Sequence, residues 1–118
     1  MIIGIGVDVV EIDRIQKIAI KNDTFALKLL TPTEYARYQT LQNRRKIEFL
    51  AGRFAAKEAF SKAMGTGIGK LSFQHIEITN NGLGAPVLTC DQFDGIIHLS
   101  ISHSHTVAVA QVVLERGA

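Results

Sequence analysis

The sequence has one cysteine, no tryptophan and no long apolar segment. A single cysteine excludes an intramolecular disulfide and a cysteine-based metal cluster, so Cys90 is expected to be a small strand residue in a reducing compartment. No run approaches the ~18 apolar residues that a membrane-spanning helix requires. The apolar N-terminus lacks a basic segment and is interrupted by Asp8, unlike a signal peptide. We therefore expect a cytoplasmic protein that does not associate with membranes.

Aromatic residues are also scarce, at 7% of the chain, and no motif offers a surface on which bases stack. This argues against nucleic-acid binding, although the charge is unevenly distributed. Residues 14–62 hold eleven of the thirteen Lys and Arg residues but four of the eleven acids, a net charge of +7, whereas the remainder carries −5. Such a separation is typical of a protein that meets an anionic partner on one side, and solvated helix faces would produce the same composition.

A chain of 118 residues with 47% hydrophobic residues is expected to form a single domain, 1–118, with its own core. A strand is predicted at 2–10 and a long helix at 44–64, ending at Gly65 as a glycine C-cap. The segment Thr31-Pro32-Thr33-Glu34 has the pattern of a capping box. The remaining predicted elements are helices at 13–22, 24–30 and 31–42, and strands at 74–79, 86–90, 95–104 and 106–114. This order predicts an α+β fold: an N-terminal strand and helices, followed by an antiparallel strand meander wrapped around the long central helix.

Two acids stand at apolar positions. Glu58 projects from the apolar stripe of the long helix, between Ala51 and Phe54, and Asp8 interrupts the N-terminal strand. A carboxylate in such a place costs free energy unless it is paired, protonated or bound to a metal. With no His or Cys close in sequence, two oxygen ligands favour Mg²⁺ over zinc. The residues alone leave other interpretations open: an i,i+4 ion pair of Glu58 with Lys62, and Asp8 as a strand-end or helix-cap acid.

Glycines and cations accompany these acids. Gly4 and Gly6 share a strand face with Asp8, which indicates close approach of a ligand or another chain. Arg53 is expected near Lys57 on the more exposed side of the long helix. The cluster Arg44-Arg45-Lys46 stands at the helix start, where cations oppose the helix dipole; it indicates either an anion site or an exposed polar segment.

The strand ending in Ser100-Ile101-Ser102-His103 carries polar residues at its tip. A Ser/His hydrolase is a weak interpretation, because alternating residues on one strand need not meet and no oxyanion motif is present. A phosphate neighbour is the better interpretation for His103, as a donor or proton shuttle.

Taken together, several segments resemble the bacterial holo-(acyl-carrier-protein) synthase family, the short, trimeric class of 4′-phosphopantetheinyl transferases. They cover nearly the whole chain in the family's order. The matching segments are Gly6-Val7-Asp8-Val9 with Glu11 and Arg14, the run from Glu48 to Ala59 with its Phe-x-x-Lys-Glu-Ala pattern, Gly65-Thr66-Gly67, and Ser100-Ile101-Ser102-His103.

The resemblance implies transfer of the 4′-phosphopantetheine group of coenzyme A to a serine of apo acyl carrier protein in support of fatty acid biosynthesis, with release of adenosine 3′,5′-bisphosphate. It implies that Asp8 and Glu58 hold Mg²⁺ and that Lys62, the third catalytic residue, lies near the phosphates. A water oriented by the ion is expected to take the serine proton, with Asp8 or Glu58 as acceptor. The substrate-binding residues that it implies are Arg45, Arg53, Lys62, Gly65 and His103.

The resemblance also implies a homotrimer with the active site between subunits. It places the acidic carrier protein on the first helix, which agrees with the basic half of the chain. The carrier-binding residues that we expect are Arg14, Lys21, Phe25 and Lys28. His105 departs from the family pattern.

Two rival functions share some of these features. A basic α+β module for RNA or another polyanion would share the charge, but it lacks a stacking platform here. A Mg²⁺-dependent phosphohydrolase would share both acids. Mass analysis of a carrier protein incubated with coenzyme A and Mg²⁺ separates the transferase from both.

Overall fold

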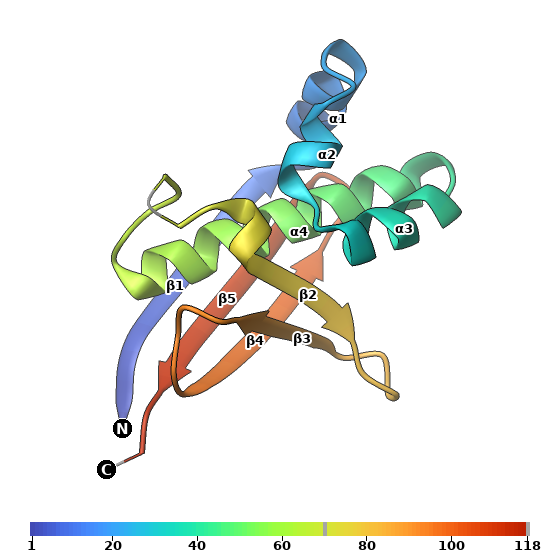
Figure 1. The fold of residues 1–118 in the computed structure, drawn as a ribbon. Coiled ribbons are helices and arrows are strands. Elements are labelled where there is room, and N and C mark those ends of the chain that lie inside the picture. Colours follow the sequence, from blue (N-terminus) through green and yellow to red (C-terminus); the bar gives the residue numbers. More distant parts are fainter. Residues whose placement is uncertain (70, 118) are drawn as a thin grey trace.

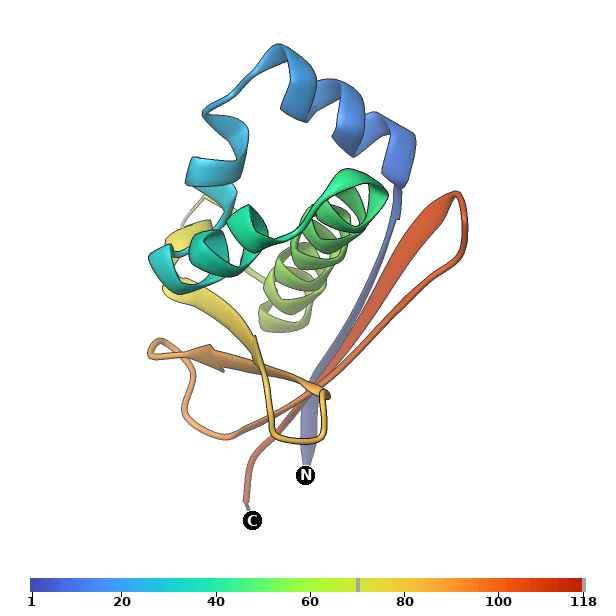
Figure 2. The same ribbon diagram turned by 90° about the vertical axis from the view of Figure 1, so that its right-hand side faces the viewer.

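The computed structural model describes residues 1–69 and 71–117 and has the α+β architecture that the sequence predicts (Figure 1). One long helix lies between a three-stranded sheet on one side and the shorter helices on the other (Figure 2). The elements are β1 (Ile2–Glu11), α1 (Ile12–Lys21), α2 (Phe25–Leu29), α3 (Pro32–Thr40), α4 (Asn43–Met64), the 3₁₀ helix η1 (Phe73–His75), β2 (Ile76–Asn80), β3 (Pro86–Cys90), β4 (Ile96–His103) and β5 (Val107–Glu115).

The predicted antiparallel strands wrap around α4, and they divide into two sheets. One sheet has the order β1-β5-β4, and β2 and β3 form a separate hairpin. The strand β5 takes the central position, and its inner face is the most deeply buried of the three strands. Its buried residues are Ala108, Ala110, Val112 and Leu114. The N-terminal strand therefore pairs with the last strand, and the two termini lie side by side (Figure 1).

The long helix α4 is confirmed, with Gly65 in the left-handed conformation at its end. Its buried side chains point in several directions, toward β1, β5 and the other helices, as expected of a central helix. The capping box is confirmed as well: the Thr31 hydroxyl accepts from the Glu34 N–H, and the Glu34 carboxylate accepts from the Thr31 N–H. The helix predicted at 13–22 begins one residue earlier, at Ile12, with Glu11 as its N-cap. No helix in the described part of the chain is long and apolar enough to cross a membrane.

The glycines of β1 serve the contact with α4. A Cβ atom on Gly4 would overlap the carbonyl oxygen of Ala63, and one on Gly6 would overlap that of Ala59. The close approach predicted for a ligand or another chain is thus made by the protein's own helix. It sets Asp8, on the same strand face, against the C-terminal half of α4.

Candidate active site

The packing of β1 on α4 brings together three of the predicted site residues. Lys62 Nζ lies 2.9 Å from Asp8 Oδ1 and donates to the Val7 carbonyl at 3.1 Å. Glu58 lies one helical turn before Lys62. The alternative Glu58–Lys62 ion pair is wrong, because Lys62 reaches across to β1. The strand-end alternative for Asp8 is wrong too, since Asp8 lies within β1, opposite Ala110 of β5.

The two carboxylates influence each other electrostatically. Burial raises the pKa of Glu58, and the nearby charge of Asp8 raises it further, against an opposing effect of Lys62. Two adjacent carboxylates with a partly desolvated member are a favourable setting for a divalent cation. Within residues 1–69 and 71–117, no group of three or more His, Cys, Asp or Glu residues gathers. An ion here would take its other oxygens from water or substrate, as Mg²⁺ commonly does.

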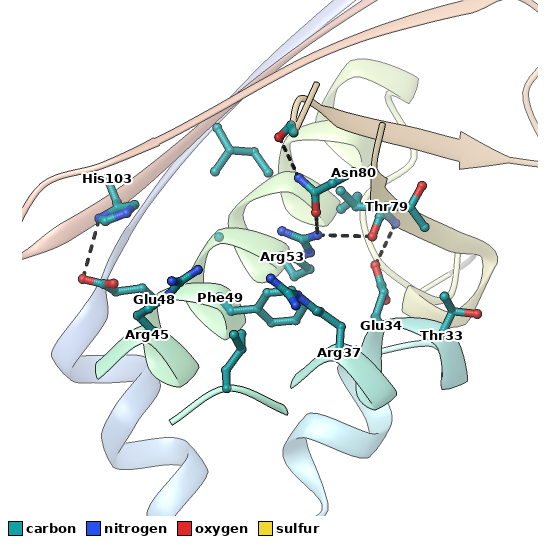
Figure 3. Close-up of a pocket in the computed structure, with 15 residues that line it drawn as sticks. Thr33, Glu34, Arg37, Arg45, Glu48, Phe49, Arg53, Thr79, Asn80 and His103 are labelled. Atoms are coloured by element: carbon teal, nitrogen blue, oxygen red, sulfur yellow. Dashed lines mark hydrogen bonds and ion pairs between the residues drawn. The ribbon is translucent and has the colours of Figure 1, made fainter. Parts of the chain in front are cut away.

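A second part of the predicted site lies elsewhere. Arg45, Arg53 and His103 line a pocket of about 620 Å³ between α3, α4, β2 and β4 (Figure 3). The described lining residues include neither Asp8, Glu58 nor Lys62. Arg45 and Glu58 stand on opposite halves of α4, roughly 20 Å apart along its axis at 1.5 Å per residue. One chain therefore carries the acids and the basic pocket as separate sites.

Arg53 forms the back of this pocket and is only 8% exposed, so the expected exposed position is wrong. Its guanidinium donates to the Ile78 carbonyl at 3.4 Å and to Asn80 Oδ1 at 3.1 Å, and stacks 4.1 Å from the Phe49 ring centroid. Its Nε is buried without a hydrogen-bond partner among the described residues. Burial is the main cause that lowers the pKa of Arg53. An anion entering the pocket would meet a cation already held in place.

Only one member of the Arg44-Arg45-Lys46 cluster lines the pocket. Arg44 donates to the His105 carbonyl and lies 3.7 Å from Glu48, and the Lys46 ammonium stands 4.7 Å from the Tyr38 ring centroid. These two cations therefore hold the start of α4 to its neighbours, and the anion-site interpretation is left to Arg45.

At the pocket entrance, His103 Nδ1 lies 3.8 Å from a Glu48 carboxylate oxygen, and the His103 side chain is half exposed. Gly65 is the C-cap of α4, three residues after Lys62, and its N–H donates to the Lys62 carbonyl at 3.0 Å; the space around its Cα is open. The geometry permits a coenzyme contact at either residue, and both roles remain predictions.

A fully buried ion pair, not predicted from the sequence, joins α4 to α3. Lys57 Nζ lies 2.6 Å from Glu34 Oε1 and also donates to the carbonyls of Leu29 and Phe73. The second Glu34 oxygen accepts from the Ile78 N–H at 2.7 Å. Lys57 was expected on the exposed side of α4; it has no solvent exposure. The available signal was the position of Lys57 between two aromatic residues at helical spacing, which should have marked a buried cation.

The predicted carrier-binding residues lie at one end of the molecule, on α1 and α2. Arg14, Lys21 and Lys28 are exposed, as predicted. Phe25 is half-buried, with its ring 6.2 Å from that of Phe54, so it offers only part of its surface. Two exposed apolar side chains, not predicted from the sequence, accompany the basic ones: Ile20, 76% exposed, and Leu27, 53% exposed.

Comparison with known proteins decides the family. The model of the 4′-phosphopantetheinyl transferase superfamily matches residues 4–114. The chain belongs to this superfamily. This transferase was compared with curated relatives. It is 57% identical over 118 residues to a holo-(acyl-carrier-protein) synthase of Bacillus velezensis, with 98% of each chain covered. It is 55% identical over 116 residues to that of Lacticaseibacillus casei, covering 98% of this chain and 94% of the relative.

Solved structures agree with the assignment of this transferase. A holo-(acyl-carrier-protein) synthase from Bacillus anthracis, in complex with CoA (3′,5′-ADP), superposes with a TM-score of 0.94 at 52% identity, with 99% of each chain covered. The synthase from Helicobacter pylori, in complex with coenzyme A, has a TM-score of 0.83 at 38% identity and covers 94% of this chain and 99% of that one. The predicted family and fold class are confirmed.

Proposed function

We propose that this chain transfers the 4′-phosphopantetheine group of coenzyme A to a serine of apo acyl carrier protein, in support of fatty acid biosynthesis. The observation that carries the proposal is the convergence of Asp8, Glu58 and Lys62 from β1 and α4 in a phosphopantetheinyl transferase. Relatives more than 50% identical bear the name of this activity, and the Bacillus anthracis relative was solved with the coenzyme.

The donor set of Asp8 and Glu58 fits a Mg²⁺ ion: two adjacent carboxylates whose mutual repulsion a cation would relieve. When bound, the ion supplies charge neutralisation for the pyrophosphate of the coenzyme. In the reaction, the serine oxygen forms a bond to the phosphorus that bears pantetheine. The bridging P–O bond breaks, and adenosine 3′,5′-bisphosphate leaves. Lys62, beside Asp8, stands where it can neutralise the departing phosphate.

The serine proton needs an acceptor. Burial and the charge of Asp8 raise the pKa of Glu58, whereas Asp8 is engaged by the Lys62 ammonium. A carboxylate with a raised pKa holds a proton more readily. Bound Mg²⁺ would oppose the rise in the pKa of Glu58, so we propose that either Glu58 or Asp8 takes the serine proton through one water.

The test of the function is a mass measurement on the carrier. Incubation of the protein with coenzyme A, Mg²⁺ and an apo acyl carrier protein should add one phosphopantetheine group to the carrier. Release of nucleotide without modification of the carrier would instead identify a phosphohydrolase. If neither product forms, the chain is instead assigned to the class of polyanion-binding modules.

The proposal includes a homotrimer with shared active sites. The 3′-phosphate of the coenzyme is only a few covalent bonds from its pyrophosphate, yet Arg45 and Glu58 are far apart on α4. A second copy that brings its acids to the basic pocket resolves this separation. The outer face of β1 offers an apolar contact surface, with Ile5 66% and Val9 61% exposed.

A charge on this apolar face should separate the subunits. We expect Ile5→Glu to yield a folded monomer by sedimentation and circular dichroism, with nearly complete loss of transfer. Leu83→Glu, the same change at an exposed position in the loop between β2 and β3, is the control and should remain assembled and active. A fully active monomer would contradict both the assembly and the shared site.

The carrier protein is proposed to dock on α1 and α2. The exposed cations Arg14, Lys17, Lys21 and Lys28 would attract an acidic partner, and Ile20 and Leu27 add apolar contact area. Attraction of this kind raises the association rate and is screened over a Debye length of ~8 Å at physiological salt.

Reversal of one docking charge should therefore affect one substrate. We expect Arg14→Glu to raise the Michaelis constant for the carrier about tenfold, with that for coenzyme A unchanged. Added salt should raise the Michaelis constant for the carrier more in the wild type than in the variant. Arg116→Glu is the matched charge reversal and should behave like the wild type; Arg116 directly follows β5, whose C-terminal end lies far from α1 and α2 (Figure 1). Equal losses toward both substrates would place Arg14 in the coenzyme site or the fold.

Two further expectations belong to the same proposal. Residues 1–118 are expected to act as a single transferase domain, and the reaction is expected to take place in the cytoplasm.

A further inference from the structure

The basic pocket contains a third guanidinium group beside those of Arg45 and Arg53. Arg37, on α3, lines the pocket together with Arg45 and Arg53 of α4. Figure 3 shows its side chain extending from α3 into the pocket, near the Arg53 guanidinium. The two charges are close enough that Arg37 contributes to the lowered pKa of Arg53. Three guanidinium groups, one from α3 and two from α4, thus surround the same pocket.

The carboxylates of the pocket are engaged with other cations. Glu34 is held by Lys57, and Glu48 lies near Arg44 and His103. In the described part of the chain, the side chains of Arg37 and Arg45 make neither an ion pair nor a hydrogen bond with protein groups, and the buried Nε of Arg53 has no partner. Guanidinium groups gathered without a protein counter-charge indicate an anionic ligand.

We propose that Arg37 is a further binding residue of the coenzyme, forming with Arg45 and Arg53 a three-guanidinium subsite for the 3′-phosphate. The assignment rests on the proposed function. A terminal phosphate monoester carries close to two negative charges and three acceptor oxygens, enough for donors that approach from both α3 and α4. The pyrophosphate is assigned to Asp8, Glu58 and Lys62 because their site accommodates a divalent cation.

The experiment compares two nucleotides that differ only in this phosphate. Calorimetry should measure the binding of adenosine 3′,5′-bisphosphate and of adenosine 5′-monophosphate to the assembled protein. We expect Arg37→Gln to weaken bisphosphate binding about tenfold, as for the loss of one charged hydrogen bond, and to leave monophosphate binding unchanged. Arg37→Lys should bind the bisphosphate with an affinity between those of the wild type and Arg37→Gln. Lys46→Gln, which removes an equal charge from α4 outside the pocket, is the control and should bind both as the wild type does.

Equal weakening of both nucleotides would overturn the assignment to the 3′-phosphate. Unchanged binding would overturn any ligand role for Arg37. The test of the Arg37 subsite and the test of the proposed function can fail independently. If the wild type modifies no carrier but its preference for the bisphosphate depends on Arg37, the subsite stands and the transferase function fails. If transfer proceeds and Arg37→Gln retains the wild-type Michaelis constant for coenzyme A, the function stands and the subsite fails.

Discussion

Replacement of Glu58 by Gln should lower Mg²⁺-dependent phosphopantetheine transfer on the order of a thousandfold and leave the fold at least as stable. The activity is lost because one of the two carboxylates that we assign to the ion becomes a neutral amide; metal stabilisation of transition-state charge is worth several kcal/mol. Mass analysis of the carrier over time measures the rate. Asp8→Asn should lose activity for the same reason. A Glu58→Gln variant with near-normal transfer would show that the ion, if bound, lies elsewhere.

The Glu58→Gln variant should also differ from the wild type in how its free energy of unfolding depends on pH, which can be measured without catalysis. Because the pKa of Glu58 is raised in the folded protein, folding favours its neutral form. This favourable contribution is complete below the ordinary pKa of a glutamate and is lost as pH rises through the raised folded value. In metal-free buffer, the free energy of unfolding of the wild type should therefore decrease across this window, and that of Glu58→Gln should decrease less.

Added Mg²⁺ should reverse this loss in the wild type. We expect a magnesium-dependent increase in Tm for the wild type above the window and none for Glu58→Gln, because a ligand stabilises only the state that binds it. Glu115→Gln, which removes an exposed acid paired with His98, is the control and should keep the response. An equal increase in all three proteins would indicate a non-specific ionic effect.

Removal of the buried Lys57 ammonium should give the largest loss of stability. Lys57→Met leaves the Glu34 carboxylate buried without its cation and the carbonyls of Leu29 and Phe73 without their donor. Loss of one partner from a buried ion pair costs about 3–5 kcal/mol. Denaturation in urea at neutral pH measures the difference. Lys62→Met, which breaks the more exposed pair with Asp8, is the matched control and should cost no more than about 1 kcal/mol.

The double variant distinguishes the ion pair from simple packing. Burial lowers the pKa of Lys57 more than the charge of Glu34 raises it. The attraction between the two charges therefore does not fully offset the desolvation of Lys57. Glu34→Gln keeps an acceptor for the N–H groups of Thr31 and Ile78 while removing the charge. Lys57→Met combined with Glu34→Gln should therefore be more stable than Lys57→Met alone. A double variant with the summed loss of both single variants would show that the two charges are not coupled.

Short-range signals in the sequence determined the features that are local in the chain. The long helix and its Gly65 terminus follow from apolar spacing and a glycine C-cap, and the capping box at Thr31 follows from residues three apart. The acids Asp8 and Glu58 were recognisable because each interrupts an apolar pattern of its own element. In every case the deciding neighbours lie within one or two turns, or within one strand, so the linear sequence displays them directly.

Contacts between residues distant in sequence were decided only by the tertiary structure. The place of β1 beside β5, the ion pair of Lys57 with Glu34 and the gathering of Arg37 with Arg53 join segments that carry no mutual signal in sequence. Each depends on how α4 packs against the sheet and against α3, and that packing is a collective outcome of the whole core. For this reason the sequence indicated which residues have the right chemistry, and only the fold showed that the acids and the basic pocket lie apart on one chain.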